Sequence, residues 1–151
     1  MEVLRVSDNI GFHTIADVCN AVMGCNYKGI QKAFFRPRGH VANDIDIFAW
    51  FPKLSIGGIN ASTSTGWVNT ISPDGELIYQ HNTKSPKIIE HDCERPLRVV
   101  FARMLDYVSG IWNYRLVGIF ACVGIGDNTN GMHSEVFRRT SDKWEIIRGS
   151  V

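Results

Sequence analysis

Residues 66–79 read GWVNTISPDGELIY, and the rest of the chain is organised around this stretch. Two short runs with strand character flank Ser72-Pro73-Asp74-Gly75, in which proline presets one backbone dihedral and glycine admits a positive one. The stretch therefore predicts a β-hairpin. Because strand side chains alternate between faces, Trp67 and Asn69 point the same way and place a flat apolar ring beside an amide. Such a pair suits a planar heterocycle; the alternative is an ordinary core tryptophan beside an asparagine that bonds to backbone.

The composition fits one domain and gives no global sign of a partner. The chain has 151 residues, of which 44% are hydrophobic, so we expect a single domain over 1–151 with a helical segment at about 1–40 and a sheet core at about 44–147. Charged residues make up 21% and the formal net charge is +1, so any basic footprint must be local. No apolar run approaches the roughly 18 residues of a membrane helix. We expect a cytoplasmic protein with no membrane partner.

The cysteines give no sign of a metal site. Cys19, Cys25, Cys93 and Cys122 lack paired short spacing, which indicates reduced thiols. The cluster His91-Asp92-Cys93 is unsuitable because adjacent residues of an extended chain point to different faces. We predict neither a metal nor a cofactor.

One helix is clearly predicted near the N-terminus, and a second follows it. Apolar residues recur at helical spacing from Ile15 to Val22, after a capping box formed by Thr14 and Asp17. A second short helix is expected from Tyr27 to Phe34. This second segment is the most basic in the chain, and three of its cations would share one helical face that could follow phosphates: Lys28, Lys32 and Arg36. The alternative is a solvated charged face.

The remaining segments predict strands. Residues 44–54 form a strand that Pro52 interrupts, which indicates an edge, a bulge or a bend. Leu97–Leu105 and Trp112–Val123 are nearly continuous apolar runs and should form the central hairpin, and two shorter strands follow at 134–140 and 143–148. The predicted fold class is α+β: a strongly curved, mostly antiparallel sheet or small barrel with one or two N-terminal helices.

Several runs of sequence together resemble a known family. They are FAWFPKL at 48–54, WVN at 67–69, SPDG at 72–75, RVVFA at 98–102, YRLVGIF at 114–120 and VFRRTS at 136–141. These runs resemble PUA-like domains and, more narrowly, the SRA-like modified-cytosine readers attached to modification-dependent restriction endonucleases. The resemblance covers about residues 40–147 and leaves the first 40 residues unexplained.

The resemblance implies a function for the opening stretch. In that family a nucleotide is flipped out of the duplex into a pocket, held between aromatic rings and read at its Watson–Crick edge. A Trp-x-Asn in the pocket belongs to the hydroxymethylcytosine-reading branch, so these roles pass to Trp67 and Asn69. The resemblance also suggests Trp50 or Phe51 for the remaining wall, and Asp74 or Tyr79 for a polar contact. The chain contains no nuclease motif, so cutting is not implied.

The first hypothesis is therefore a non-catalytic module that reads a methylated or hydroxymethylated cytosine in DNA, in preference to RNA, and works with a nuclease or other effector. Six cations would contact phosphates: Lys28, Lys32, Arg36, Arg38, Arg138 and Arg139.

Two alternatives remain open at this point. One is a small hydrolase or nuclease, either metal-dependent or histidine-dependent, that uses His40 with Asp44 and Asp46, or His81 with His91 and Asp92. The other is a protein–protein adaptor or inhibitor whose exposed aromatics mark an interface.

Overall fold

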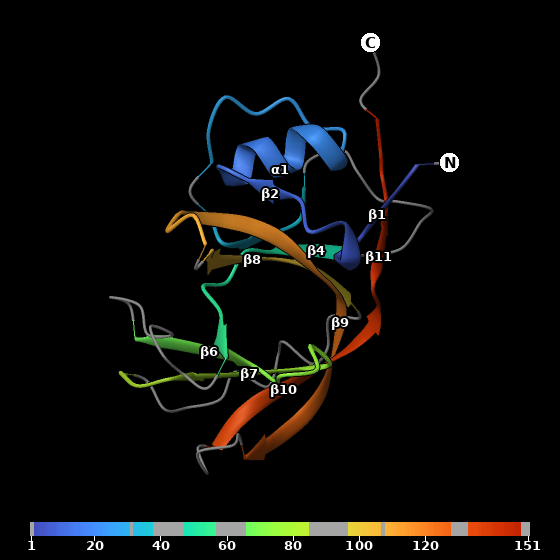
Figure 1. The fold of residues 1–151 in the computed structure, drawn as a ribbon. Coiled ribbons are helices and arrows are strands. Elements are labelled where there is room, and N and C mark those ends of the chain that lie inside the picture. The colour runs from blue at the N-terminus through green and yellow to red at the C-terminus, as the bar shows by residue number, and fades with distance from the viewer. Residues whose placement is uncertain are drawn as a thin grey trace.

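The computed structural model describes residues 2–30, 32–37, 47–56, 66–84, 97–106, 108–127 and 133–148. Strands dominate this part of the chain (Figure 1). In chain order the elements are β1 (Val3–Arg5), the 3-10 helix η1 (Val6–Asp8), β2 (Gly11–Phe12), α1 (Ile15–Val22), β3 (Phe34–Phe35), β4 (Ile47–Trp50), β5 (Ser55–Ile56), β6 (Trp67–Ile71), β7 (Leu77–Asn82), β8 (Leu97–Leu105), β9 (Trp112–Asp127), β10 (His133–Ser141) and β11 (Lys143–Glu145).

Within the described residues the main sheet has nine strands and is mostly antiparallel, as predicted. Its order is β3-β4-β8-β9-β10-β7-β6-β5, with β2 paired to β9 as well. Among the described strand pairs, β4–β8 and β5–β6 alone are parallel. The order runs from β3 to β5 without returning, so the described strands do not form a closed barrel. The predicted central hairpin is confirmed as β8 and β9, which pair from Arg98 opposite Phe120 to Leu105 opposite Trp112.

Strand β9 connects the two parts of this sheet and bends between them in Figure 1, where it is orange. Its first half pairs with β8 and its second half pairs with β10. Register shifts occur near Gly118 in both ladders, and Gly118 has φ 132°. A Cβ at this position would lie 2.6 Å from the backbone oxygen of Ser141, so only glycine fits the crossing.

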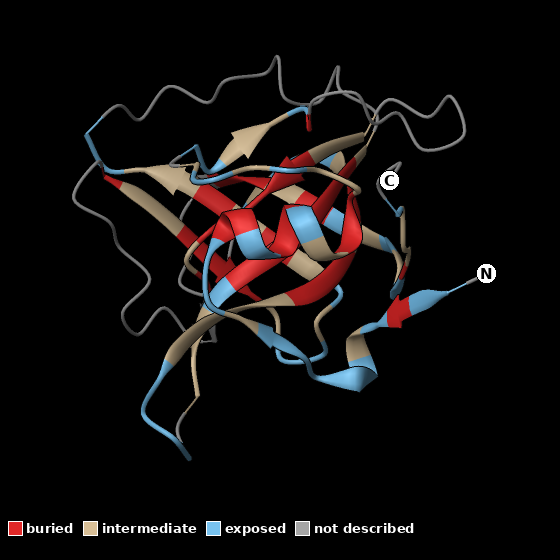
Figure 2. Ribbon diagram, turned by 90° about the horizontal axis from the view of Figure 1, so that it is seen from above, coloured by how far each residue is buried: buried red, intermediate tan, exposed pale blue. Residues whose placement is uncertain are grey.

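Helix α1 forms where the sequence predicted it. The Thr14 hydroxyl accepts from the Asp17 amide at 3.0 Å and the Asp17 carboxylate accepts from the Thr14 amide at 3.2 Å, which completes the capping box. The helix lies across the sheet in Figure 2, with its buried side toward the strands.

The prediction of a second helix is wrong. No helix occurs between residues 26 and 37 in the part that is described, and Phe34–Phe35 instead forms β3 against β4. Tyr27 is fixed by Asn20, which accepts from the Tyr27 amide at 2.7 Å and donates to its carbonyl at 2.8 Å. These tertiary bonds override the weak helical spacing. Lys28, Lys32 and Arg36 therefore share no helical face.

The sheet separates two hydrophobic cores. On the side of α1, Ala49, Phe51 and Phe101 pack with the helix. On the other side, Trp50 and Val100 pack with residues from β6, β7, β9 and β10. Neighbouring residues of β4 and β8 thus supply opposite cores, as strand alternation requires.

The chain ends are joined by a two-stranded ribbon. Strand β1 pairs with β11, and the buried Trp144 of β11 donates from Nε1 to the Val22 carbonyl at 2.8 Å, at the end of α1. This bond ties the helix to the C-terminal ribbon.

Two findings bear on the cysteines and on the membrane prediction. Cys19 and Cys25 are free thiols, but Cys122 is disulfide-bonded, which contradicts the expectation of four reduced thiols.

None of the described helices has the length and apolarity needed to cross a membrane.

Candidate functional site

The hairpin β6–β7 is present with the turn that the sequence predicted. The Gly75 amide donates to the Ser72 carbonyl at 2.9 Å, and Gly75 has φ 75°. Asp74 accepts from the Ser72 hydroxyl at 2.6 Å and from the Glu76 amide at 3.0 Å. The hydrogen bond from Ser72 is the main reason that the pKa of Asp74 is lowered. Asp74 thus holds the turn together, and this turn lies at the far end of β6 from Trp67.

Trp67 and Asn69 share one face of the hairpin, as predicted. Trp67 is half-buried at the start of β6, opposite Asn82, and Asn69 is only 4% exposed, opposite Gln80. The Oδ1 atom of Asn69 is buried and accepts no hydrogen bond within the described part of the chain. Buried amide oxygens in folded proteins almost always have a donor, so this acceptor is exceptional.

Asn69 belongs to a row of buried polar side chains across three strands. Gln80 of β7 lies directly opposite Asn69 of β6 and also directly opposite Glu135 of β10. Gln80 is 7% exposed and Glu135 is 3% exposed. We call Asn69, Gln80 and Glu135 the polar row. Two amides and a carboxylate side by side offer both donors and acceptors in a region of low dielectric constant.

A buried arginine borders the polar row. Arg98 of β8 is 4% exposed, and its Cζ lies 4.3 Å from the ring centroid of Phe137, 4.4 Å from that of Phe34 and 4.8 Å from that of Trp50. Phe137 is two residues from Glu135 in β10, so both face the same side. The guanidinium is thus surrounded by three aromatic faces, an arrangement that stabilises a desolvated cation.

The structure separates the other candidates for the pocket. Trp50 lies with Phe137, at a centroid distance of 5.1 Å, on the side of the polar row. Phe51 faces the opposite core, where it stacks on Phe35 and Phe101. Tyr79 is adjacent to Gln80 in β7 and points to the other face of the strand. Trp67, Asn69 and Trp50 therefore share a side of the sheet, whereas Phe51 and Tyr79 do not.

The proposed phosphate contacts are not one cluster. Lys28, Lys32 and Arg36 are exposed on the irregular segment before β4, and Arg36 lies 5.5 Å from the Phe48 centroid. Arg38 lies outside the described residues. In β10, Arg138 is exposed.

Arg139 has a structural partner. Its guanidinium donates to Glu76 at 2.8 Å and to the Val117 carbonyl at 3.4 Å. The charge of Arg139 is therefore already balanced within the sheet.

The residues of the alternative hydrolase lie mostly outside the described part: His40, Asp44, Asp46, His91 and Asp92. His81 is half-buried on β7, on the face opposite to Gln80, and its buried Nδ1 has no hydrogen-bond partner in the described structure. Within the described chain, no three residues of the types His, Cys, Asp and Glu come together as metal ligands.

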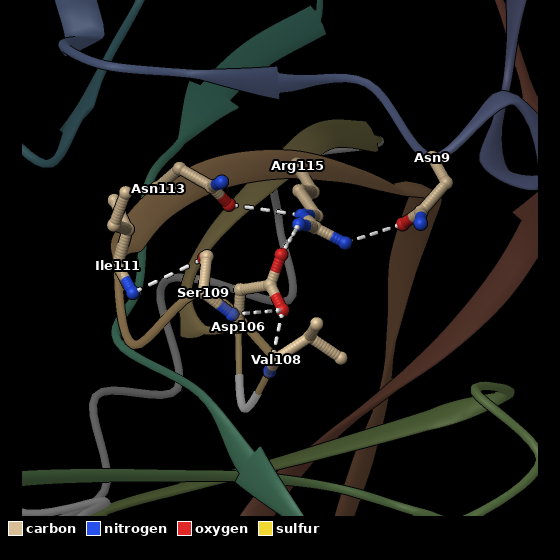
Figure 3. A network of polar contacts seen from close by, with 7 residues as sticks. All are labelled: Asn9, Asp106, Val108, Ser109, Ile111, Asn113 and Arg115. Carbon is tan, nitrogen blue, oxygen red and sulfur yellow. Dashed lines mark hydrogen bonds and ion pairs between the residues drawn. The ribbon is translucent and has the colours of Figure 1, made fainter.

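A separate polar network stabilises the turn between β8 and β9 (Figure 3). Arg115 donates to Asp106 at 3.0 Å, to Asn113 at 2.9 Å and to Asn9 at 2.5 Å. Asp106 also accepts from the Val108 amide at 2.9 Å, and this bond is the largest contribution to its lowered pKa. The network fixes the turn to the loop after η1.

A cleft of about 250 Å³ lies beside this network, between the N-terminal segment and the strands β8 and β9. Its apolar lining includes Val6, Ile10 and Met104. None of the three residues of the polar row lines it, so the cleft and the row are different places on the molecule.

Sequence reasoning missed Gln80, Arg98 and Glu135. Arg98 is a charged residue inside an apolar strand, which is a usable signal of an unusual buried group, whereas Glu135 lies in a polar strand and gives no such signal. Their position beside Asn69 depends on pairing between segments distant in sequence, and no local pattern specifies that pairing.

The comparison with known families decides the relationship. The sequence profile of the SET and RING associated domain, SRA, matches residues 1–146. The chain belongs to the SRA family. The SRA match begins at residue 1, so the family also accounts for the first 40 residues, which the resemblance to known runs had left unexplained.

Among solved structures, this SRA chain is similar to the 5-hydroxymethylcytosine-specific restriction enzyme AbaSI, with a TM-score of 0.73 and 26% sequence identity. The alignment covers 98% of this chain and 44% of the AbaSI chain, so the SRA chain spans less than half the length of that enzyme. No curated protein sequence matches it.

Proposed function

We propose that this SRA protein binds DNA and reads a modified cytosine, with 5-hydroxymethylcytosine as the preferred base. Membership of the SRA family and similarity to a restriction enzyme specific for 5-hydroxymethylcytosine support this function. The observation that carries it is the buried Asn69 oxygen, which has no donor among the described residues and lies at one end of the polar row. Such a group in a folded protein calls for an explanation, and the explanation we propose is a ligand that donates to it.

The chemistry of the polar row suits cytosine. The cytosine edge presents an amino donor at N4 and acceptors at N3 and O2. The Glu135 carboxylate and the Asn69 oxygen accept hydrogen bonds, and the Gln80 amide donates them. The hydroxyl of a 5-hydroxymethyl group adds one more donor that a methyl group lacks. We assign this side of the sheet, with Trp67 and Trp50 as aromatic walls, as the reading site.

The base reaches this site by flipping out of the duplex. A base inside the helix cannot present its Watson–Crick edge to buried side chains, so extrusion is required, at a cost of about a few kcal/mol in lost stacking and pairing. Stacking on aromatic rings returns about 1–3 kcal/mol per base. In this proposal the sheet curves strongly around the flipped base.

In this proposal the residues of this chain supply the reading function. An effector such as a nuclease would supply any cutting. Arg138 and the segment with Lys28, Lys32 and Arg36 supply phosphate contacts outside the pocket, because these basic side chains are exposed on the surface.

Binding to matched duplexes tests this function. Fluorescence anisotropy would be measured with three labelled duplexes of one sequence that contain hydroxymethylcytosine, methylcytosine or cytosine at one position. We expect the tightest binding to the hydroxymethylated duplex, and Tyr79→Phe should bind like the wild type because Tyr79 faces away from the polar row. Equal binding to all three duplexes contradicts the proposal.

A further inference from the structure

A second feature lies on the face of β8 that carries α1, away from the polar row. Trp112 begins β9, and two cations rest on its ring: Lys53 Nζ lies 5.1 Å from a ring centroid of the indole and Arg103 Cζ lies 5.5 Å from one. Arg103 is exposed, and Lys53 and Trp112 are partly exposed. We call these three residues the indole patch.

The backbone fixes the two cations next to each other. The Arg103 amide donates to the Pro52 carbonyl at 2.7 Å, and the Leu54 amide donates to the Arg103 carbonyl at 3.2 Å. These two bonds make Lys53 and Arg103 direct neighbours in a short parallel bridge. Pro52 has no N–H group, so β4 ends before it and the chain continues into this bridge. The interruption that the sequence predicted at Pro52 thus places a lysine beside an arginine.

Among the described residues, no carboxylate balances this pair. No ion pair within the described part of the chain includes Lys53 or Arg103. Arg115, Arg139 and Arg148, by contrast, each have an acidic partner. Like charges directly opposite each other on neighbouring strands destabilise a sheet, so the pair of Lys53 and Arg103 is unfavourable for stability. The contact with Trp112 orders both cations without neutralising them. An ordered pair of unneutralised cations on a partly exposed aromatic ring fits an anion.

The patch also lies at an open place on the molecule. It adjoins the turn between β8 and β9, which lies on the left in Figure 1. Val108, at 98% exposure, and Ile111, at 57%, flank the patch, so its surroundings are open.

We infer that Lys53 and Arg103, held on Trp112, each bind a phosphate of the DNA backbone. This inference rests on the proposed function for the identity of the nucleic acid. The ligand chemistry is that of a phosphodiester, and the contact is independent of base sequence because it touches no base edge. The patch therefore contributes to affinity for any duplex and leaves the preference for the modified base unchanged.

The salt dependence of binding tests the inference. Each phosphate contact contributes about 0.9 to the slope of log affinity against log salt concentration. Lys53→Gln and Arg103→Gln should each lower that slope by about this amount. When the salt concentration rises from about 50 to 200 mM, the factor by which the affinity falls should therefore be roughly 3.5 times smaller for each variant than for the wild type. Arg103→Lys should keep the slope. Lys143→Gln, an exposed lysine on β11, removes the same charge elsewhere and is the matched control.

The outcomes separate this inference from the proposed function. The inference is overturned if the salt slopes of Lys53→Gln and Arg103→Gln equal those of the wild type and of Lys143→Gln, even if the modified duplex is still preferred. The patch would then serve another anion, such as an acidic protein surface. Reduced slopes in a protein that binds all three duplexes equally support the phosphate site and contradict the reader function. The glutamine variants replace exposed or half-exposed side chains, and far-UV circular dichroism checks that they fold.

Discussion

Asn69→Leu should make the protein more stable and a poorer reader at the same time. Leucine has the same number of side-chain heavy atoms as asparagine and the same branching, but it lacks the buried Oδ1, which has no hydrogen-bond donor in the described structure. A buried unsatisfied polar group costs about 1–3 kcal/mol. We expect Asn69→Leu to raise the free energy of unfolding by about 1 kcal/mol, because leucine's extra width offsets part of the gain.

The expected shift in melting temperature follows from the chain length. A change of 1 kcal/mol corresponds to roughly 2–4 °C for a domain of about 150 residues. Differential scanning calorimetry on the free protein measures it. The matched control is Asn20→Leu, since Asn20 makes two hydrogen bonds to Tyr27 and the same substitution there should lower stability by about 1–3 kcal/mol.

The same Asn69→Leu variant should lose discrimination between bases. Specific side-chain contacts to a base edge contribute about 1–3 kcal/mol, so the preference for the hydroxymethylated duplex should fall by roughly 5- to 150-fold. Anisotropy titrations with the modified and unmodified duplexes measure this ratio. A lower melting temperature together with an unchanged preference would refute the reasoning, because Asn69 would then be a structural residue.

Two further predictions concern the scaffold around the site. The pKa of Asp106 is held below its usual value of 3.8, chiefly by the Val108 amide and also by Arg115, so its contribution to stability is present above that value and is lost as the pH falls through the folded-state pKa. Urea denaturation from pH 7 to pH 3 should therefore show a wild-type advantage over Asp106→Asn that is constant at neutral pH and shrinks below about pH 4; an advantage that grows in acid would contradict it. Gly118→Ala should destabilise the protein by roughly 1–3 kcal/mol or more, because its φ of 132° and the 2.6 Å approach to the Ser141 oxygen exclude a Cβ; a melting temperature equal to that of the wild type would show that β9 can relax there.

Local signals in the sequence were sufficient to predict the elements whose ends are marked by a capping or turn motif. The capping box at Thr14 and Asp17 marked the start of α1, and Ser72–Gly75 marked the turn of the β6–β7 hairpin. The second helix failed because a weak apolar spacing competed with pairing between Phe34 and Trp50, which are distant enough in sequence to leave no local trace.

The site was predictable only in part, for two different reasons. Alternation along a strand already implied that Trp50 and Phe51 face opposite sides. The sequence alone could therefore have shown that the two residues do not both line the same base pocket. The polar row could not be foreseen, because Glu135 reaches Gln80 through the register of β10 on β7, and a shift of one residue would have turned Glu135 to the other face.

The central claim is that the side chains of the polar row contact the modified base, and side-chain amide NMR tests it most directly. The amide resonances of Asn69 and Gln80 would be followed as a duplex with one hydroxymethylcytosine is added, with the unmodified duplex as comparison and Asn20, which is bonded to Tyr27, as internal reference. Our account predicts that the Asn69 and Gln80 resonances shift with the modified duplex alone while that of Asn20 stays in place. Unchanged Asn69 and Gln80 resonances under saturating binding would contradict it.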